Sequence, residues 1–140
     1  MRSFVVLFVW LLGVLFPFVW LGRFSKAYQN MFDLIFGPEW MHIIMHVILY
    51  AVLGILLSIA FRLRLHKQTV LDIGLIILGI GILQESMQLL SQGLVFPQPI
   101  ALARGCFDLG VDLVGGLLGL FVLQQLRISF RLSKCDQTYH

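Results

Sequence analysis

The sequence predicts an all-α membrane protein, a single domain over residues 1–140 with four transmembrane helices. Of the 140 residues, 59% are hydrophobic and only 12% are charged, whereas soluble domains are about 45–50% apolar and about 25% charged. At ~1.5 Å per helical residue, an apolar run of about 20 residues crosses a hydrocarbon core of about 30 Å. Because backbone groups in lipid must bond within their own segment, such runs are expected to be α-helices. The predicted spans cover residues 4–22, 40–61, 69–91 and 105–126.

The first run, residues 4–22, is expected to be a retained helix rather than a cleaved signal peptide. It exceeds the apolar core of a signal peptide, which has about 7–15 residues, and no A-x-A-like cleavage site follows it. Residues 23–39 have apolar side chains at helical spacing with polar ones opposite, which predicts a short amphipathic helix lying in the membrane interface. Ser25 is expected to cap its start, and Gly37-Pro38 to end it.

The later connectors differ in character. Residues 62–68 form a short basic loop between the second and third spans. Residues 92–104 contain Pro97 and Pro99 among apolar residues, which predicts a folded or re-entrant loop. Residues 127–140 are expected to form a basic tail.

The distribution of lysine and arginine predicts that both termini are cytoplasmic. With the amino terminus inside, seven of the ten basic residues lie on the inner side and three on the outer side, as the positive-inside rule requires. The inner set is Arg2, Arg62, Arg64, Lys67, Arg127, Arg131 and Lys134, and the outer set is Arg23, Lys26 and Arg104. This topology separates Cys106 from Cys135 across the membrane, so we expect no disulfide between them.

Polar and ionisable residues occur inside the last three predicted spans, where each charged side chain costs at least ~2.5–3.5 kcal/mol. The topology places them at one level, ~5–10 Å below the outer membrane edge. On each helix they are spaced three or four residues apart, so they share one face and are expected to turn inward. The predicted polar pocket comprises these residues and Arg104, which lies just outside the last span: His42, His46, Tyr50, Glu85, Gln88, Arg104, Asp108 and Asp112.

Two glycines are expected to let the helices that carry these residues pack closely. Gly115 and Gly119 form a GxxxG pair in the fourth predicted span, and such pairs permit close approach of backbones in membranes. Glycine is also common in transmembrane helices without this role.

The order of these motifs resembles the VanZ-like family of small membrane proteins over about residues 42–123. The matching motifs are His46-Val-Ile-Leu-Tyr50, then Gln84-Glu85-Ser-Met-Gln88, then Arg104 followed by the glycine-rich helix that begins with Asp108 and Asp112. Gln84 stands where the family often has Asp, and Asp112 where Asn is common. The spacing from Arg104 to Asp108 is tighter than the family pattern, and a register with Asp112 in the Asp108 role also fits.

The resemblance implies a place in the bacterial cytoplasmic membrane and the cell envelope. The founding member is associated with low-level resistance to the lipoglycopeptide teicoplanin, but the family has no established biochemical activity. The resemblance therefore implies a setting rather than a reaction.

Several functions remain open from the residues alone. The first is a pocket in the outer leaflet that binds a lipid-linked or lipid-like molecule, with Arg104 as a forked donor to a phosphate or carboxylate. The second is an accessory subunit of a respiratory or photosynthetic membrane complex, in which His42 and His46 could ligate haem or a pigment. The third is a metal site of His46, Glu85 and one of the aspartates.

The polar groups could also serve only to hold the helices together, with Glu85 bound to His46 and Asp108 to Arg104. We expect internal hydrogen bonding of the histidines rather than cofactor or metal ligation. Membrane lipid and other membrane subunits are the expected partners, and nucleic acid is not. No Gly-x-Ser-x-Gly elbow surrounds any serine, so a nucleophilic triad is not expected. The sequence leaves enzymatic activity undecided and leans against it.

Overall fold

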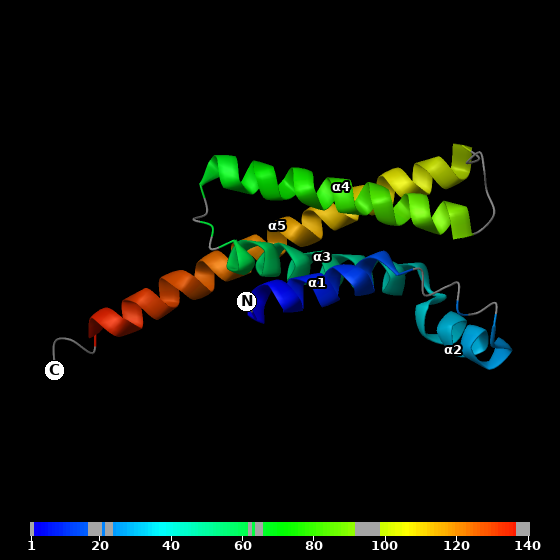
Figure 1. The fold of residues 1–140 in the computed structure, drawn as a ribbon, viewed down its shortest axis with the longest axis horizontal. Coiled ribbons are helices and arrows are strands. Elements are labelled where there is room, and N and C mark those ends of the chain that lie inside the picture. Colours follow the sequence, from blue (N-terminus) through cyan, green and yellow to red (C-terminus); the bar gives the residue numbers. More distant parts are fainter. Residues whose placement is uncertain are drawn as a thin grey trace.

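The computed structural model describes residues 2–16, 21, 24–61, 63, 66–91 and 99–136, and every regular element in these ranges is an α-helix. Figure 1 shows a layered arrangement of four helices, with α2 projecting at one end and the C-terminal half of α5 projecting at the other. The helices are α1 (Arg2–Leu15), α2 (Lys26–Phe36), α3 (Glu39–Ala60), α4 (Lys67–Ser91) and α5 (Pro99–Asp136).

Three helices, α3, α4 and α5, are long and apolar enough to cross a membrane. Their apolar side chains remain largely exposed on the outside of the bundle, as lipid-facing surfaces are. Helix α1 is also apolar but has 14 residues, about 21 Å, which is shorter than the run predicted over residues 4–22. Residues 17–20 and 22 of that run lie outside the described residues.

Helix α2 occupies the segment predicted to be amphipathic. The Ser25 hydroxyl accepts a hydrogen bond from the backbone amide of Tyr28 at 3.3 Å, which confirms the predicted cap. The helix ends at Gly37, whose amide bonds to the carbonyl of Asp33. Pro38 then caps the start of α3 in an extended conformation, where its lack of a backbone donor costs no helical hydrogen bond.

Helix α5 corrects the predicted boundaries of the last span. It runs for 38 residues from Pro99 to Asp136, so residues 99–104 are helical rather than part of a loop, and the first part of the basic tail is helical too. Residues 92–98 and 137–140 lie outside the described residues. Hydropathy marks only the part of a helix that lipid can surround, whereas Leu, Gln, Arg and Lys continue a helix well beyond it.

The contacts fix the directions of the three long helices. His42 meets Asp108 and His46 meets Asp112, so residue numbers rise together and α3 is parallel to α5. Between α4 and α5 the order reverses, because Gly81 lies beside Asp112 whereas Glu85 lies beside Gly105. Helix α4 is therefore antiparallel to both, as three consecutive membrane crossings require (Figure 1).

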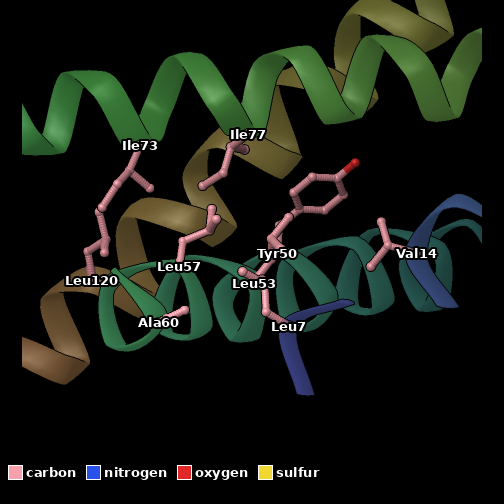
Figure 2. Packing of buried hydrophobic residues seen from close by; sticks show 9 residues of the cluster. All are labelled: Leu7, Val14, Tyr50, Leu53, Leu57, Ala60, Ile73, Ile77 and Leu120. Atoms are coloured by element: carbon pink, nitrogen blue, oxygen red, sulfur yellow. The ribbon is translucent and has the colours of Figure 1, made fainter. Parts of the chain in front are cut away.

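The apolar core lies between α1, α3, α4 and α5, towards the end of the bundle away from α2. Figure 2 shows its nine buried residues: Ile73 and Ile77 of α4 point towards α3, and Leu57 of α3 points back towards α4. Helix α1 adds Leu7 and Val14, and its Trp10 indole donates a hydrogen bond to the carbonyl of Leu49 at 3.1 Å. Helix α1 thus packs on α3.

The interface between α3 and α5 is built on glycine. A Cβ added to Gly115 would lie 2.7 Å from the Val47 carbonyl oxygen, and one added to Gly119 would overlap the Ala51 carbonyl oxygen. From the other side, a Cβ on Gly54 would lie 2.7 Å from the Gly116 carbonyl oxygen. The two backbones are therefore in direct contact, and short side chains on α3 can reach side chains at the same level of α5.

Candidate functional site

A groove opens where α3 and α5 begin. Its volume is about 700 Å³, within the range of about 300–1,000 Å³ typical of small-molecule sites. One part of its lining is ionisable and another part is apolar, so the groove is amphipathic. The ionisable residues are Glu39, His42, Arg104 and Asp108, and the others are Gly37, Ile43, Ile100, Ala103 and Phe107.

Two ionisable pairs line the groove. His42 Nε2 lies 3.5 Å from Asp108 Oδ2, and 45% of the His42 side chain is exposed against 16% for Asp108. One helical turn earlier on α5, Arg104 Nη2 lies 3.9 Å from Glu39 Oε1, with both side chains largely exposed. Both contacts are longer than a good hydrogen bond, so a ligand can compete for these groups.

A second histidine–aspartate pair lies one turn deeper. His46 Nδ1 and Asp112 Oδ1 are 2.7 Å apart, and both residues are buried. The ring centroids of His42 and His46 are 4.4 Å apart, so the outer histidine covers the inner one. The parallel register of α3 and α5 produces this repetition, since both the histidines and the aspartates are four residues apart.

Below the inner pair, Tyr50 donates a hydrogen bond from its hydroxyl to Gln84 Oε1 at 2.7 Å, and both residues are buried. Gly81 makes room here, because a Cβ on it would lie 3.0 Å from Asp112 Oδ2 and 3.5 Å from the Tyr50 hydroxyl. The polar column thus runs from the groove to Tyr50, where the apolar core closes it.

Two carboxylate oxygens in this column are buried and accept no hydrogen bond from the described residues: Glu85 Oε1 and Asp112 Oδ2. The other oxygen of Glu85 faces Gly105 on α5. A buried acceptor without a donor costs about 1–3 kcal/mol. These two oxygens are therefore where the site gains most from an additional donor.

The structure brings the predicted pocket residues to one end of the bundle but pairs them differently from expectation. The alternative of a purely structural role paired Glu85 with His46 and Asp108 with Arg104; in the structure Asp112 binds His46 and Asp108 faces His42. The reason is that α5, not α4, packs backbone-to-backbone on α3. Arg104 instead approaches Glu39. Gln88 is half-buried on α4, one turn beyond Gln84.

Sequence reasoning left several site residues out of the predicted pocket. Gln84 has a readable signal, because Ile77, Gly81 and Gln84 follow at helical spacing and all three are buried. Glu39 precedes the first apolar turn of α3, and in the sequence it looks like any solvated acidic residue at the start of a helix. Ile43, Ile100, Ala103 and Phe107 carry no signal, since apolar residues that line a groove resemble those that face lipid.

Within the described ranges, no three His, Cys, Asp or Glu side chains are arranged so that they could hold a metal ion. Ligation of haem or a pigment by His42 Nε2 or His46 Nδ1 would require the aspartate opposite that nitrogen to give way. What the arrangement can do is bind a polar group at the groove and exchange hydrogen bonds with the column behind it.

Comparisons with protein families, with curated proteins and with solved structures found no match to this chain.

Proposed function

We propose that this chain is a VanZ-like protein of the bacterial cytoplasmic membrane that binds a lipid-like amphiphile in the groove between α3 and α5. The observation that carries the proposal is the composition of the groove. Charged groups and apolar side chains share one lining at the ends of two helices that are long and apolar enough to span a membrane. A headgroup at the membrane surface with a chain reaching into the hydrocarbon would match both.

The proposed topology has α1 as a fourth span and both termini in the cytoplasm. It is supported by the basic residues at the bundle end opposite the groove, where Arg127 donates a hydrogen bond to the Leu63 carbonyl at 3.0 Å. Helix α2 then lies in the outer interface, with Leu34 82% exposed and Met31 53% exposed on its surface. The groove opens to the outer leaflet in this orientation.

Binding can be tested by filling the groove. Ala103→Trp places an indole in the lining, and the full chain extracted in mild detergent should then lose amphiphiles that the unmodified protein retains in native mass spectrometry. Val114→Trp is the matched control, because Val114 is exposed on the same helix and does not line the groove. Equal retention in both variants would place the amphiphile elsewhere.

The proposed envelope role is tested separately in a Gram-positive host. Expression of the chain should raise tolerance to teicoplanin, and Glu85→Gln and Asp108→Asn should reduce that tolerance at equal protein level. Full tolerance with both variants would show that the polar pocket is not needed for the function.

A further inference from the structure

The groove carries charges of both signs within a short distance, and their arrangement limits which headgroup can bind. This inference rests on the proposed function, because it concerns the ligand of the same groove. Arg104 and Asp108 lie four residues apart on α5, about 6 Å along the helix axis. Glu39 faces Arg104 from α3.

The pair at the mouth of the groove is easily opened. The side chains of Arg104 and Glu39 are 77% and 92% exposed, with 3.9 Å between Nη2 and Oε1. An exposed pair of this kind contributes about 0–1 kcal/mol, so a ligand can replace it at little cost. The guanidinium can then bind an anionic group with two parallel hydrogen bonds.

The carboxylates of the groove exclude a headgroup that is only anionic. Asp108 and Glu39 both line the groove, and Asp112 and Glu85 lie behind it on α5 and α4. An anion placed on Arg104 would therefore approach two carboxylates in the lining with one guanidinium to compensate. A headgroup that is only cationic meets the opposite problem, because it leaves Arg104 facing a positive charge.

We propose that the groove binds a zwitterionic amphiphile that carries a phosphate and an ammonium group. Arg104 binds the phosphate, Asp108 and Glu39 accept hydrogen bonds from the ammonium, and the chain lies along Ile43 and Phe107. Each charged group of the ligand meets its opposite, and neither charge of the protein is left against a like charge. The His42 ring lies beside this site, between Asp108 and His46.

The test compares short-chain lipids that share their acyl chains and differ in headgroup charge. Dihexanoyl phosphatidylethanolamine is the zwitterion, dihexanoyl phosphatidylglycerol is the anion, and a dihexanoyl lipid with a primary ammonium headgroup and no phosphate is the cation. Each is titrated against the full chain in non-ionic detergent. We expect the zwitterion to bind about tenfold more tightly than either singly charged lipid, the difference that one charge-assisted hydrogen bond supplies. Free phosphoethanolamine, without chains, should not compete at the same concentration.

Two variants distinguish a zwitterion site from general lipid adhesion, because they should shift the preference in opposite directions. Arg104→Gln should weaken binding of the zwitterionic lipid and strengthen binding of the cationic one. Asp108→Asn should weaken binding of the zwitterionic lipid and strengthen binding of the anionic one. Glu39→Gln repeats the second test at a residue 92% exposed, where folding is not affected. Lys67→Gln and Asp72→Asn, at the other end of the bundle, are the matched charge controls and should change nothing.

The outcomes separate this inference from the proposed function. Equal binding of the three lipids, or tightest binding of the anion, would overturn the preference for a zwitterion but leave the amphiphile site in place. Failure of every lipid to bind, or equal binding in Ala103→Trp, overturns both. Competition by free phosphoethanolamine would show that the ligand is a soluble zwitterion rather than a lipid. It would therefore contradict the proposal that the groove binds an amphiphile.

Discussion

His46 and Asp112 form the shortest polar contact between α3 and α5, at 2.7 Å, and both are buried. His42 and Asp108 have the same residue types and the same helical spacing, yet their atoms are 3.5 Å apart and partly exposed. Water can replace the outer contact, but it cannot reach the inner one. The two pairs are therefore expected to differ in what they contribute, the inner one to stability and the outer one to ligand binding.

Removal of the inner carboxylate should destabilise the fold more than removal of the outer one. Asp112→Ala leaves the buried Nδ1 of His46 without its partner, and we expect a loss of about 1–3 kcal/mol in the free energy of unfolding. Asp108→Ala should cost less than about 1 kcal/mol, because its pair is partly solvated. Unfolding by SDS in mixed micelles, followed by circular dichroism, measures both. Equal losses would contradict the difference in burial.

The hydrogen bond from Tyr50 to Gln84 should contribute modestly. Side-chain hydrogen bonds between membrane helices average about 0.6 kcal/mol, so Tyr50→Phe is expected to cost about that amount. A double-mutant cycle with Gln84→Leu isolates the pairwise energy. A coupling energy near zero would mean that the bond of 2.7 Å does not persist in the membrane.

At the scale of residues, the sequence predicts which side chains share a level but not which of them pair. Depth follows from counting residues along each helix, and inward facing follows from the cost of a polar group in lipid. The choice between Glu85 and Asp112 as the partner of His46 depends on which helix approaches α3 most closely. That choice depends on the match between two surfaces rather than on the residue types alone.

At the scale of elements, the approach of α5 to α3 depends on Gly115 and Gly119. Because hydrophobic association is weak between helices already in lipid, close backbone packing supplies much of the attraction. The predicted GxxxG motif lies in this interface, with Val47 and Ala51 opposite it. The polar pairs and the glycines thus occupy one continuous contact between the same two helices.

Gly119→Ala is expected to weaken this contact, because its Cβ would overlap the Ala51 carbonyl oxygen. Overpacking of this kind typically costs about 1–3 kcal/mol. Gly110→Ala is the matched control on the same helix, since a Cβ there meets nothing within 4 Å. That variant should be neutral or up to about 1 kcal/mol more stable through helix propensity. Thermal unfolding of both in detergent decides, and a stable Gly119→Ala protein would rule out the tight interface.

Helix boundaries were less predictable than helix positions. The predicted spans at 40–61 and 69–91 agree within two residues with α3 and α4, because in these two segments the apolar run and the helix have nearly the same extent. Helix α5 extends six residues before and ten after its predicted span at 105–126. At about 57 Å it is nearly twice as long as the hydrocarbon core is thick. Pro99 was misread as a loop signal because proline also fits the first turn of a helix.

At the scale of the molecule, the alternating helix directions put the groove at one end and most of the basic residues in the described ranges at the other. Helices α3 and α5 both start at the groove end, and α4 runs in the opposite direction along one side of this pair (Figure 1). The polar column therefore opens at one end only and is closed by the apolar core around Leu53 and Ile77 (Figure 2). A bundle built this way suits binding from one side of a membrane better than conduction across it.

The proposed orientation predicts which loops a membrane-impermeant maleimide can reach. In a background of Cys106→Ser and Cys135→Ser, Ser25→Cys should be labelled in intact cells. His66→Cys, at the opposite end of the bundle, should be labelled only after permeabilisation. The reverse pattern would turn the groove towards the cytoplasm.

The parallel pairing of α3 with α5 has a consequence for how the chain is made. His46 and Asp112 are separated by 66 positions, which a ribosome translates in about 3–13 s at ~5–20 residues per second. During that interval α3 is already synthesised, and α4 must insert in the opposite direction. The helix α5, which carries the aspartates that pair with the histidines of α3, does not yet exist. We expect α3 to remain near the insertion machinery while His42 and His46 lack their aspartate partners. A chain stalled before Asp108 should be recognised as incomplete because these two histidines are still unpaired.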